Sequence, residues 1–129
     1  MSKPARISDT RTGYVDGKFN YLGRTADQWL PEAISAIVRN FAPLKIILFG
    51  SRARGEQGAD SDIDLLIVLS EVKNKRAQTA KMLVALADVP APVDIILTDL
   101  DEISRRGELV GTVLWPALHE GKILYERSA

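Results

Sequence analysis

The stretch KIILFGSRARGEQGADSDIDLLIVL, from Lys45 to Leu69, is the most informative part of this chain. It consists of two apolar runs, 45–49 and 63–69, separated by a polar segment that contains three glycines. Neither run alternates polar with apolar residues along its whole length, and continuous apolar runs are typical of strands buried on both faces. We therefore expect two central strands of a sheet, joined by a connection that is free to bind a ligand.

Upstream of these runs, the spacing predicts a helix over 31–41, with Pro31 at its first position. The expected apolar face of that helix comprises Ala33, Ile34, Ile37, Val38 and Phe41. A capping-box pattern occurs earlier, at 25–28, but a helix beginning there would place Pro31 in its interior. We therefore expect a separate short turn before Pro31.

Downstream, the pattern predicts a helix over 75–87 and a third apolar strand over 93–97. The expected apolar face of this helix comprises Ala77, Ala80, Val84 and Ala87. A further helical pattern over 102–120 is interrupted by Pro116 and ended by Gly121, and 122–126 suits an edge strand. This order of elements predicts an α/β fold, a small mixed β-sheet with flanking helices.

The first 24 residues are polar and show no helical period. Asp16-Gly17 lies between two short pairs that contain apolar residues, which predicts a short hairpin. A length of 129 residues suits one domain. We therefore expect a polar N-terminal extension over 1–24 and a single domain over 25–129.

Composition excludes several kinds of chemistry. The chain has no cysteine and one histidine, His119, which excludes disulfides and thiol catalysis and argues against a histidine triad or metal cage. Basic and acidic residues balance at 17 each, so no net positive charge indicates a nucleic-acid partner. No apolar run reaches the roughly 18 residues of a membrane span, and the start lacks the apolar core of a signal peptide. We expect a cytoplasmic protein without a membrane partner.

The turn after the first strand has residues suited to phosphate. Gly50 allows a ligand to approach the backbone, and the Ser51 hydroxyl can donate to a phosphate oxygen. A helix beginning here would add free N–H groups, while Arg52 and Arg54 can form charge-assisted hydrogen bonds with a polyphosphate. An ordinary strand–helix junction, with Ser51 as N-cap and both arginines solvated, fits the same residues.

Three aspartates on two predicted strands form a candidate metal site. Asp62 and Asp64 lie two residues apart at the start of an apolar strand, so their side chains share one face. Asp94 interrupts another apolar strand, where a charge is unfavourable unless it is paired, solvated or bound to metal. Oxygen-only ligands suit Mg²⁺ or Mn²⁺. Alternatively, Asp62 caps the preceding loop and Asp64 is solvated at the strand edge.

Gly50-Ser51, ten further residues, Asp62-x-Asp64 and a later strand Asp94 form a pattern that resembles the minimal nucleotidyltransferases of the DNA polymerase β superfamily. The resemblance extends over roughly 31–126 and implies the polymerase β-like nucleotidyltransferase fold. It implies that Gly50 and Ser51 hold a nucleoside triphosphate. It also implies that Asp62, Asp64 and Asp94 hold divalent metals and catalyse the transfer.

The implied reaction is a metal-dependent transfer of a nucleoside monophosphate, AMP from ATP, to an acceptor hydroxyl, with Mg²⁺ or Mn²⁺ as the cofactor. Small members of the superfamily resemble antitoxins that silence a HEPN-domain toxin by adding AMP to a tyrosine, so a HEPN-domain protein is the expected partner. Two alternatives stay open. One is a non-catalytic binding module that neutralises its partner by occlusion. The other is a small-molecule transferase resembling aminoglycoside nucleotidyltransferases, which usually have an additional substrate domain.

Overall fold

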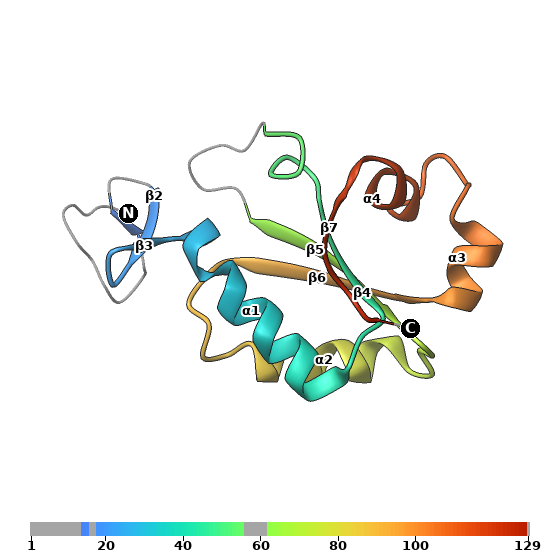
Figure 1. Cartoon of the computed structure of the whole chain (residues 1–129), viewed down its shortest axis with the longest axis horizontal. Helices are drawn as coiled ribbons and strands as arrows, with labels where there is room; N and C mark the ends of the chain where they lie inside the picture. The colour runs from blue at the N-terminus through green and yellow to red at the C-terminus, as the bar shows by residue number, and fades with distance from the viewer. Residues whose placement is uncertain (1–13, 16–17, 56–61, 129) are drawn as a thin grey trace.

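The computed structural model describes residues 14–15, 18–55 and 62–128, and its larger sheet has four strands. In sequence order these are β4 (Lys45–Phe49), β5 (Ile63–Leu69), β6 (Val93–Asp99) and β7 (Lys122–Glu126). They lie side by side in the order β6-β5-β4-β7, with β4 antiparallel to β5 and β7, and β5 parallel to β6. The predicted mixed sheet is confirmed, and so are the predicted bounds of β4, β5 and β7 (Figure 1).

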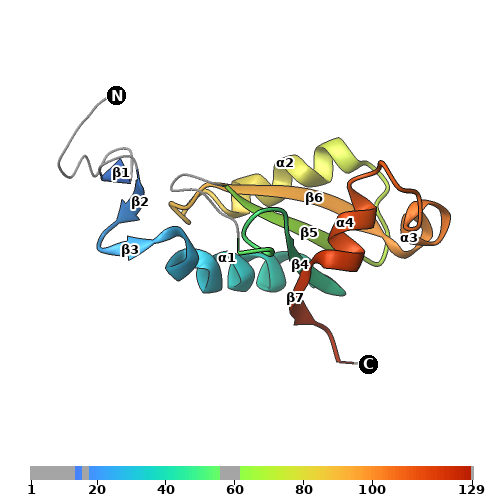
Figure 2. The same ribbon diagram turned by 90° about the horizontal axis from the view of Figure 1, so that it is seen from above.

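Helices cover both faces of this sheet. Helices α1 (Ala26–Phe41) and α2 (Lys75–Ala85) lie on one face, and α4 (Leu114–Glu120) lies on the other (Figures 1 and 2). The short α3 (Leu100–Arg106) follows directly after β6. Alternate residues of β5 pack on opposite sides, Leu65 with α1 and α2 and Leu66 with α4. The central strands are therefore buried on both faces, as their apolar runs predict.

Helix α1 begins five residues earlier than predicted, so the expected separate turn before Pro31 is wrong. Thr25 is the N-cap of a capping box in which the Thr25 backbone N–H donates to Gln28 Oε1 at 2.8 Å. Pro31 lies inside the helix and is exposed. The carbonyl that Pro31 cannot bond belongs to Asp27, an exposed residue of the first turn, where water can replace the lost bond.

Helix α2 is confirmed, but its predicted buried face is wrong. Met82 is fully buried and Leu86, just past the helix end, is 7% exposed, whereas Val84 is 74% exposed. The other predicted core positions of this segment, Ala77, Ala80 and Ala87, are exposed as well. Two long side chains four residues apart bury more apolar area than three alanines do, so they determine which face meets the sheet.

The helical pattern over 102–120 forms two helices, α3 and α4, rather than one. Gly111 adopts φ of +100° in the connection between them. Pro116 is the third residue of α4, where its missing N–H removes no helical hydrogen bond. Gly121 caps α4 as predicted, and a Cβ there would lie 2.5 Å from Ile47 Cγ2. Glycine at this position therefore lets the end of α4 approach β4 closely.

A second, small antiparallel sheet precedes α1 and consists of β1 (Tyr14–Val15), β2 (Lys18–Tyr21) and β3 (Arg24–Thr25). Pairing of β1 with β2 confirms the strands of the predicted hairpin, while its turn, Asp16-Gly17, lies outside the described residues. Arg24 connects this sheet to α1, since its guanidinium is 4.1 Å from the centre of the Trp29 ring and 2.9 Å from Glu32. The predicted domain division at residue 24 stays a prediction.

Candidate functional site

The register of the larger sheet places the predicted aspartates at one end of it. Asp64 and Asp94 are direct partners in the parallel pair of β5 and β6, whose backbones run about 4.8 Å apart. Asp62 comes one residue before β5. On the other side of β5, Asp64 is paired with Phe49, the residue that precedes Gly50. The predicted acidic residues and the predicted phosphate turn are therefore neighbours in the fold.

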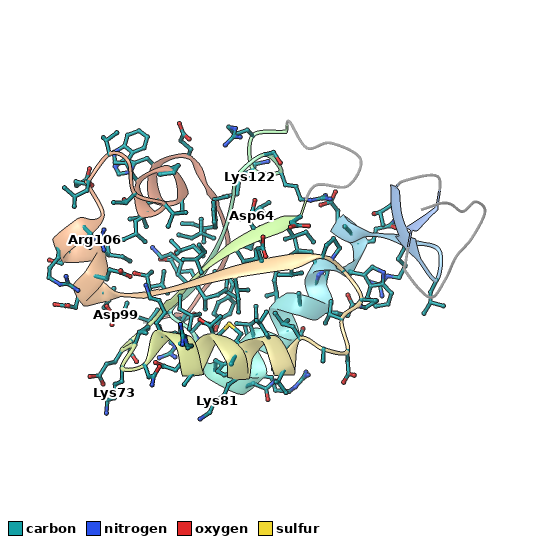
Figure 3. The ribbon with its side chains drawn as sticks, turned by 180° about the vertical axis from the view of Figure 1, so that it is seen from behind. Asp64, Lys73, Lys81, Asp99, Arg106 and Lys122 are labelled. Carbon is teal, nitrogen blue, oxygen red and sulfur yellow. The ribbon has the colours of Figure 1, made fainter. Side chains whose placement is uncertain are left out.

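The side chain of Asp64 lies on the face of the sheet that α4 covers in part. Leu66, two residues further along β5, packs against Leu114 and Ala117 of α4, and residues two apart share a face. Figure 3 shows Asp64 on the opposite side of the sheet from α2. Asp64 is partly buried, whereas Asp62 and Asp94 are exposed. Solvent and a ligand can therefore reach this group of carboxylates.

Gly50 lies against Asp64, and any side chain at that position would have to displace the Asp64 carboxylate. Its φ is +77°, which L side chains adopt only with strain. A Cβ built on Gly50 would lie 2.5 Å from Oδ2 of Asp64, closer than any ordinary non-bonded contact. The glycine predicted to admit a ligand also makes room for the central carboxylate.

The three carboxylates are close enough to influence one another electrostatically. Burial raises the pKa of Asp64 most, and the negative charges of Asp94 and Asp62 raise it further, while the positive charge of Arg52 lowers it. Among the described residues, no three acidic or histidine side chains converge as a ready-made metal site. The oxygen donors and their mutual repulsion nevertheless fit the chemistry of a divalent cation such as Mg²⁺.

The phosphate turn is not the start of a helix in the part of the chain that the structure describes, which corrects one element of the sequence prediction. Residues 51–55 form a turn in which the N–H groups of Ala53 and Arg54 both donate to the Gly50 carbonyl, at 3.2 and 3.3 Å. The Gly55 N–H donates to the Arg52 carbonyl at 3.3 Å. The described residues therefore place no helix N-terminus, and no helix dipole, at this turn. A ligand would contact a compact turn instead.

The two predicted arginines have different environments. Arg54 is exposed, whereas the Arg52 side chain is only 7% exposed and pairs with Asp27 of α1 at 2.8 Å. Sequence reasoning missed Asp27, because an acidic residue in the first turn of a helix is already explained by the helix dipole. Nothing in the chain's spacing relates position 27 to position 52, so only the fold reveals their contact.

The larger sheet carries an Asp-x-Asp pair at the start of a central strand, a third aspartate on the parallel neighbour and a glycine turn against Asp64, which is the arrangement that the motif predicts for a nucleotidyltransferase. The family described as "Polymerase beta, Nucleotidyltransferase" matches residues 32–129. The chain therefore belongs to the polymerase β nucleotidyltransferase family, as the motif predicts.

One solved structure supports the fold, and two more are similar at lower TM-scores. A protein from Sulfolobus solfataricus, proposed to be a nucleotidyltransferase, is similar with a TM-score of 0.56 and 24% identity, over 77% of this chain and 78% of that one. A mutant of the toxin–antitoxin MntA-HpeT is similar with a TM-score of 0.46 and 21% identity, over 76% and 73% of the two chains. A toxin–antitoxin with AMP-PNP has a TM-score of 0.45 and 23% identity, over 75% and 73%.

No curated protein matches the sequence. Among the described residues, no helix combines the length and apolar character needed to cross a membrane.

Proposed function

We propose that this protein transfers a nucleoside monophosphate, AMP from ATP, to a hydroxyl group of a partner protein, and that the partner is a HEPN-domain toxin. The observation that carries the proposal is the placement of Asp64 beside Asp94 on the neighbouring strand, two residues after Asp62 and directly against Gly50. Family membership supports the transferase class. The resemblance of the motif to that of small antitoxins supports the choice of acceptor.

The turn over 50–55 would bind the triphosphate. Gly50 has no side chain to keep a phosphate from the backbone, and Ser51 is partly exposed, so its hydroxyl can donate to a phosphate oxygen. The exposed Arg54 can add a charge-assisted hydrogen bond. These groups would orient the α-phosphate toward the carboxylates, and orientation of this kind is a large part of catalysis in phosphoryl transfer.

Mg²⁺ or Mn²⁺, held by Asp62, Asp64 and Asp94, would supply neutralisation of the phosphate charge. A bound cation would also stabilise the carboxylates, because the like charges around the partly buried Asp64 repel one another. In the reaction, the acceptor oxygen forms a bond to the α-phosphorus while the bond to the bridging oxygen breaks, and pyrophosphate leaves with the electron pair. Asp94 is exposed, so it can receive the hydroxyl proton and release it to water.

Exposed apolar side chains support a protein as the acceptor. Leu109, Val110 and Val113 are 51%, 81% and 39% exposed and lie on the connection between α3 and α4. This connection lies on the α4 side of the sheet, the side that Asp64 faces (Figures 1 and 3). Exposed apolar groups gathered in one segment are typical of protein-binding surfaces.

The proposal is tested by incubating the purified protein with ATP, Mg²⁺ and a lysate of its host, with the label on either the α- or the γ-phosphate. We expect a discrete protein band labelled from the α-position only. The Asp62→Asn/Asp64→Asn double variant should give no band, and an Asp101→Asn variant, altered at an exposed site on α3, should label like the wild type. Label from the γ-position would indicate a kinase and refute the proposal.

Two further outcomes would replace the proposal with another function. Label confined to the low-mass fraction would indicate a small-molecule transferase. Absence of label, combined with unchanged neutralisation of a co-expressed HEPN-domain toxin by the double variant, would indicate neutralisation by occlusion. The first outcome is read from the labelling reaction and the second also needs the co-expression, so the wild type and the double variant together separate the three functions.

A further inference from the structure

The ion pair between Asp27 and Arg52 connects helix α1 to the turn that follows β4. Their closest atoms, Asp27 Oδ1 and Arg52 Nη1, are 2.8 Å apart, and the residues are separated by 25 positions in the chain. Another Asp–Arg pair of equal length joins Asp101 to Arg105, but there the arginine side chain is 61% exposed. At Arg52 it is 7% exposed. A charge so far removed from water depends strongly on its partner, whereas a surface pair contributes little.

Burial in the core holds the next residue of the turn. Ala53 is 8% exposed and belongs to the apolar cluster that includes Ala26 and Trp29 from the first turns of α1. The turn is thus joined to α1 by an ion pair at Arg52 and anchored in the apolar core at the next residue. Arg52 and Ala53 also lie within the hydrogen-bonded turn whose N–H groups donate to the Gly50 and Arg52 carbonyls. Moving Arg52 would therefore move the backbone of the whole turn.

We propose that Asp27 is a positioning residue: through Arg52 it fixes the turn over 50–55 in the conformation that binds the triphosphate. The identity of the ligand rests on the proposed function. Because Arg52 is held by Asp27 and largely buried, its role is to place the turn, whereas the Arg54 side chain is exposed to solvent and to a ligand. A turn ordered before the ligand arrives binds it more tightly, because less conformational entropy is lost on binding.

The test uses Asp27→Asn, which removes the charge from a side chain that is 56% exposed, so the variant is expected to fold. Asp27→Glu serves as the conservative rescue variant, and Asp101→Asn is the control, since it removes the charge from an Asp–Arg pair of the same length. Two quantities are measured in each full-length protein. One is hydrogen exchange of the Ala53, Arg54 and Gly55 amides, and the other is the Kd of ATP with Mg²⁺.

We expect Asp27→Asn to speed exchange of these three amides and to raise the Kd about tenfold, a change between those of exposed and buried ion pairs. Asp27→Glu should restore both quantities, and Asp101→Asn should change neither. Unchanged exchange in Asp27→Asn would overturn the inference, and so would faster exchange with an unchanged Kd. If the wild type binds no nucleotide at all, the proposed function fails, while the exchange measurement still decides whether Asp27 holds the turn.

Discussion

Gly50→Ala tests the close approach of the phosphate turn to the central carboxylate. The φ of +77° at Gly50 imposes a left-handed backbone on alanine, which costs about 1–2 kcal/mol. The new Cβ would also lie 2.5 Å from Asp64 Oδ2, and displacing a packed group of this kind costs about 1–3 kcal/mol. We therefore expect a loss of about 2–5 kcal/mol in the free energy of unfolding, together with loss of Mg²⁺-dependent nucleotide binding because Asp64 moves.

Gly55→Ala is the matched control for this prediction. Gly55 lies in the same turn with nearly the same φ, +73°, but no heavy atom of the described residues lies within 4 Å of its added Cβ. The Gly55→Ala variant should therefore lose only about 1–2 kcal/mol of unfolding free energy, which is what a left-handed backbone costs alanine. The free energy of unfolding is measured by urea denaturation and the nucleotide Kd by calorimetry. The reasoning is refuted if both variants are equally destabilised and bind nucleotide equally well, or if removing the carboxylate with Asp64→Ala does not lessen the effect of Gly50→Ala.

Two further predictions concern carboxylates whose pKa the fold shifts in opposite directions. The pKa of Asp64 is higher in the folded than in the unfolded protein. The metal-free protein therefore loses stability as pH rises from the unfolded pKa, about 3.9, through the raised pKa of the folded state. Asp64→Asn should abolish this loss and raise the Tm at pH 7 without metal, and an unchanged Tm would contradict the prediction. The backbone N–H groups of Glu102 and Val72 each donate to the Asp99 carboxylate at 2.8 Å and lower the pKa of Asp99. The contribution of Asp99 to the free energy of unfolding is therefore present above about pH 3.9 and is lost as pH falls through the lowered pKa of the folded state. Asp99→Ala should cost about 1–3 kcal/mol at pH 7 in urea denaturation, with nucleotide affinity intact; a change in affinity would show that this end of the sheet also affects the site.

Much of the fold follows from local pattern. The bounds of β4 and β5 were predictable because each is a continuous apolar run that ends at polar or glycine residues. The first bond of Asp99 is local, since an aspartate before a helical run commonly accepts from the first N–H groups of the helix. Its second bond, from the Val72 N–H, is not local, because that donor lies 27 positions away in another connection.

Local pattern fails where packing chooses between alternatives of similar local free energy. Pro31 argues for a helix start, yet the capping box at Thr25 and the contacts of Arg24 with Trp29 and Glu32 extend α1 beyond it. In α2 the alanine face and the face of Met82 have the same helical period, and the larger apolar area of Met82 and Leu86 decides which face is buried.

For the site, the sequence alone determined which residues are the candidates: Gly50, Ser51 and the three aspartates stand out by type and spacing. Only the tertiary structure decided how they meet. The register of β5 with β6 pairs Asp64 with Asp94, the positive φ of Gly50 brings the turn against Asp64, and Asp27 reaches Arg52 from a helix far away in the chain. Spacing along a chain sets which face a side chain occupies within one element, whereas contacts between elements arise only when the whole core packs.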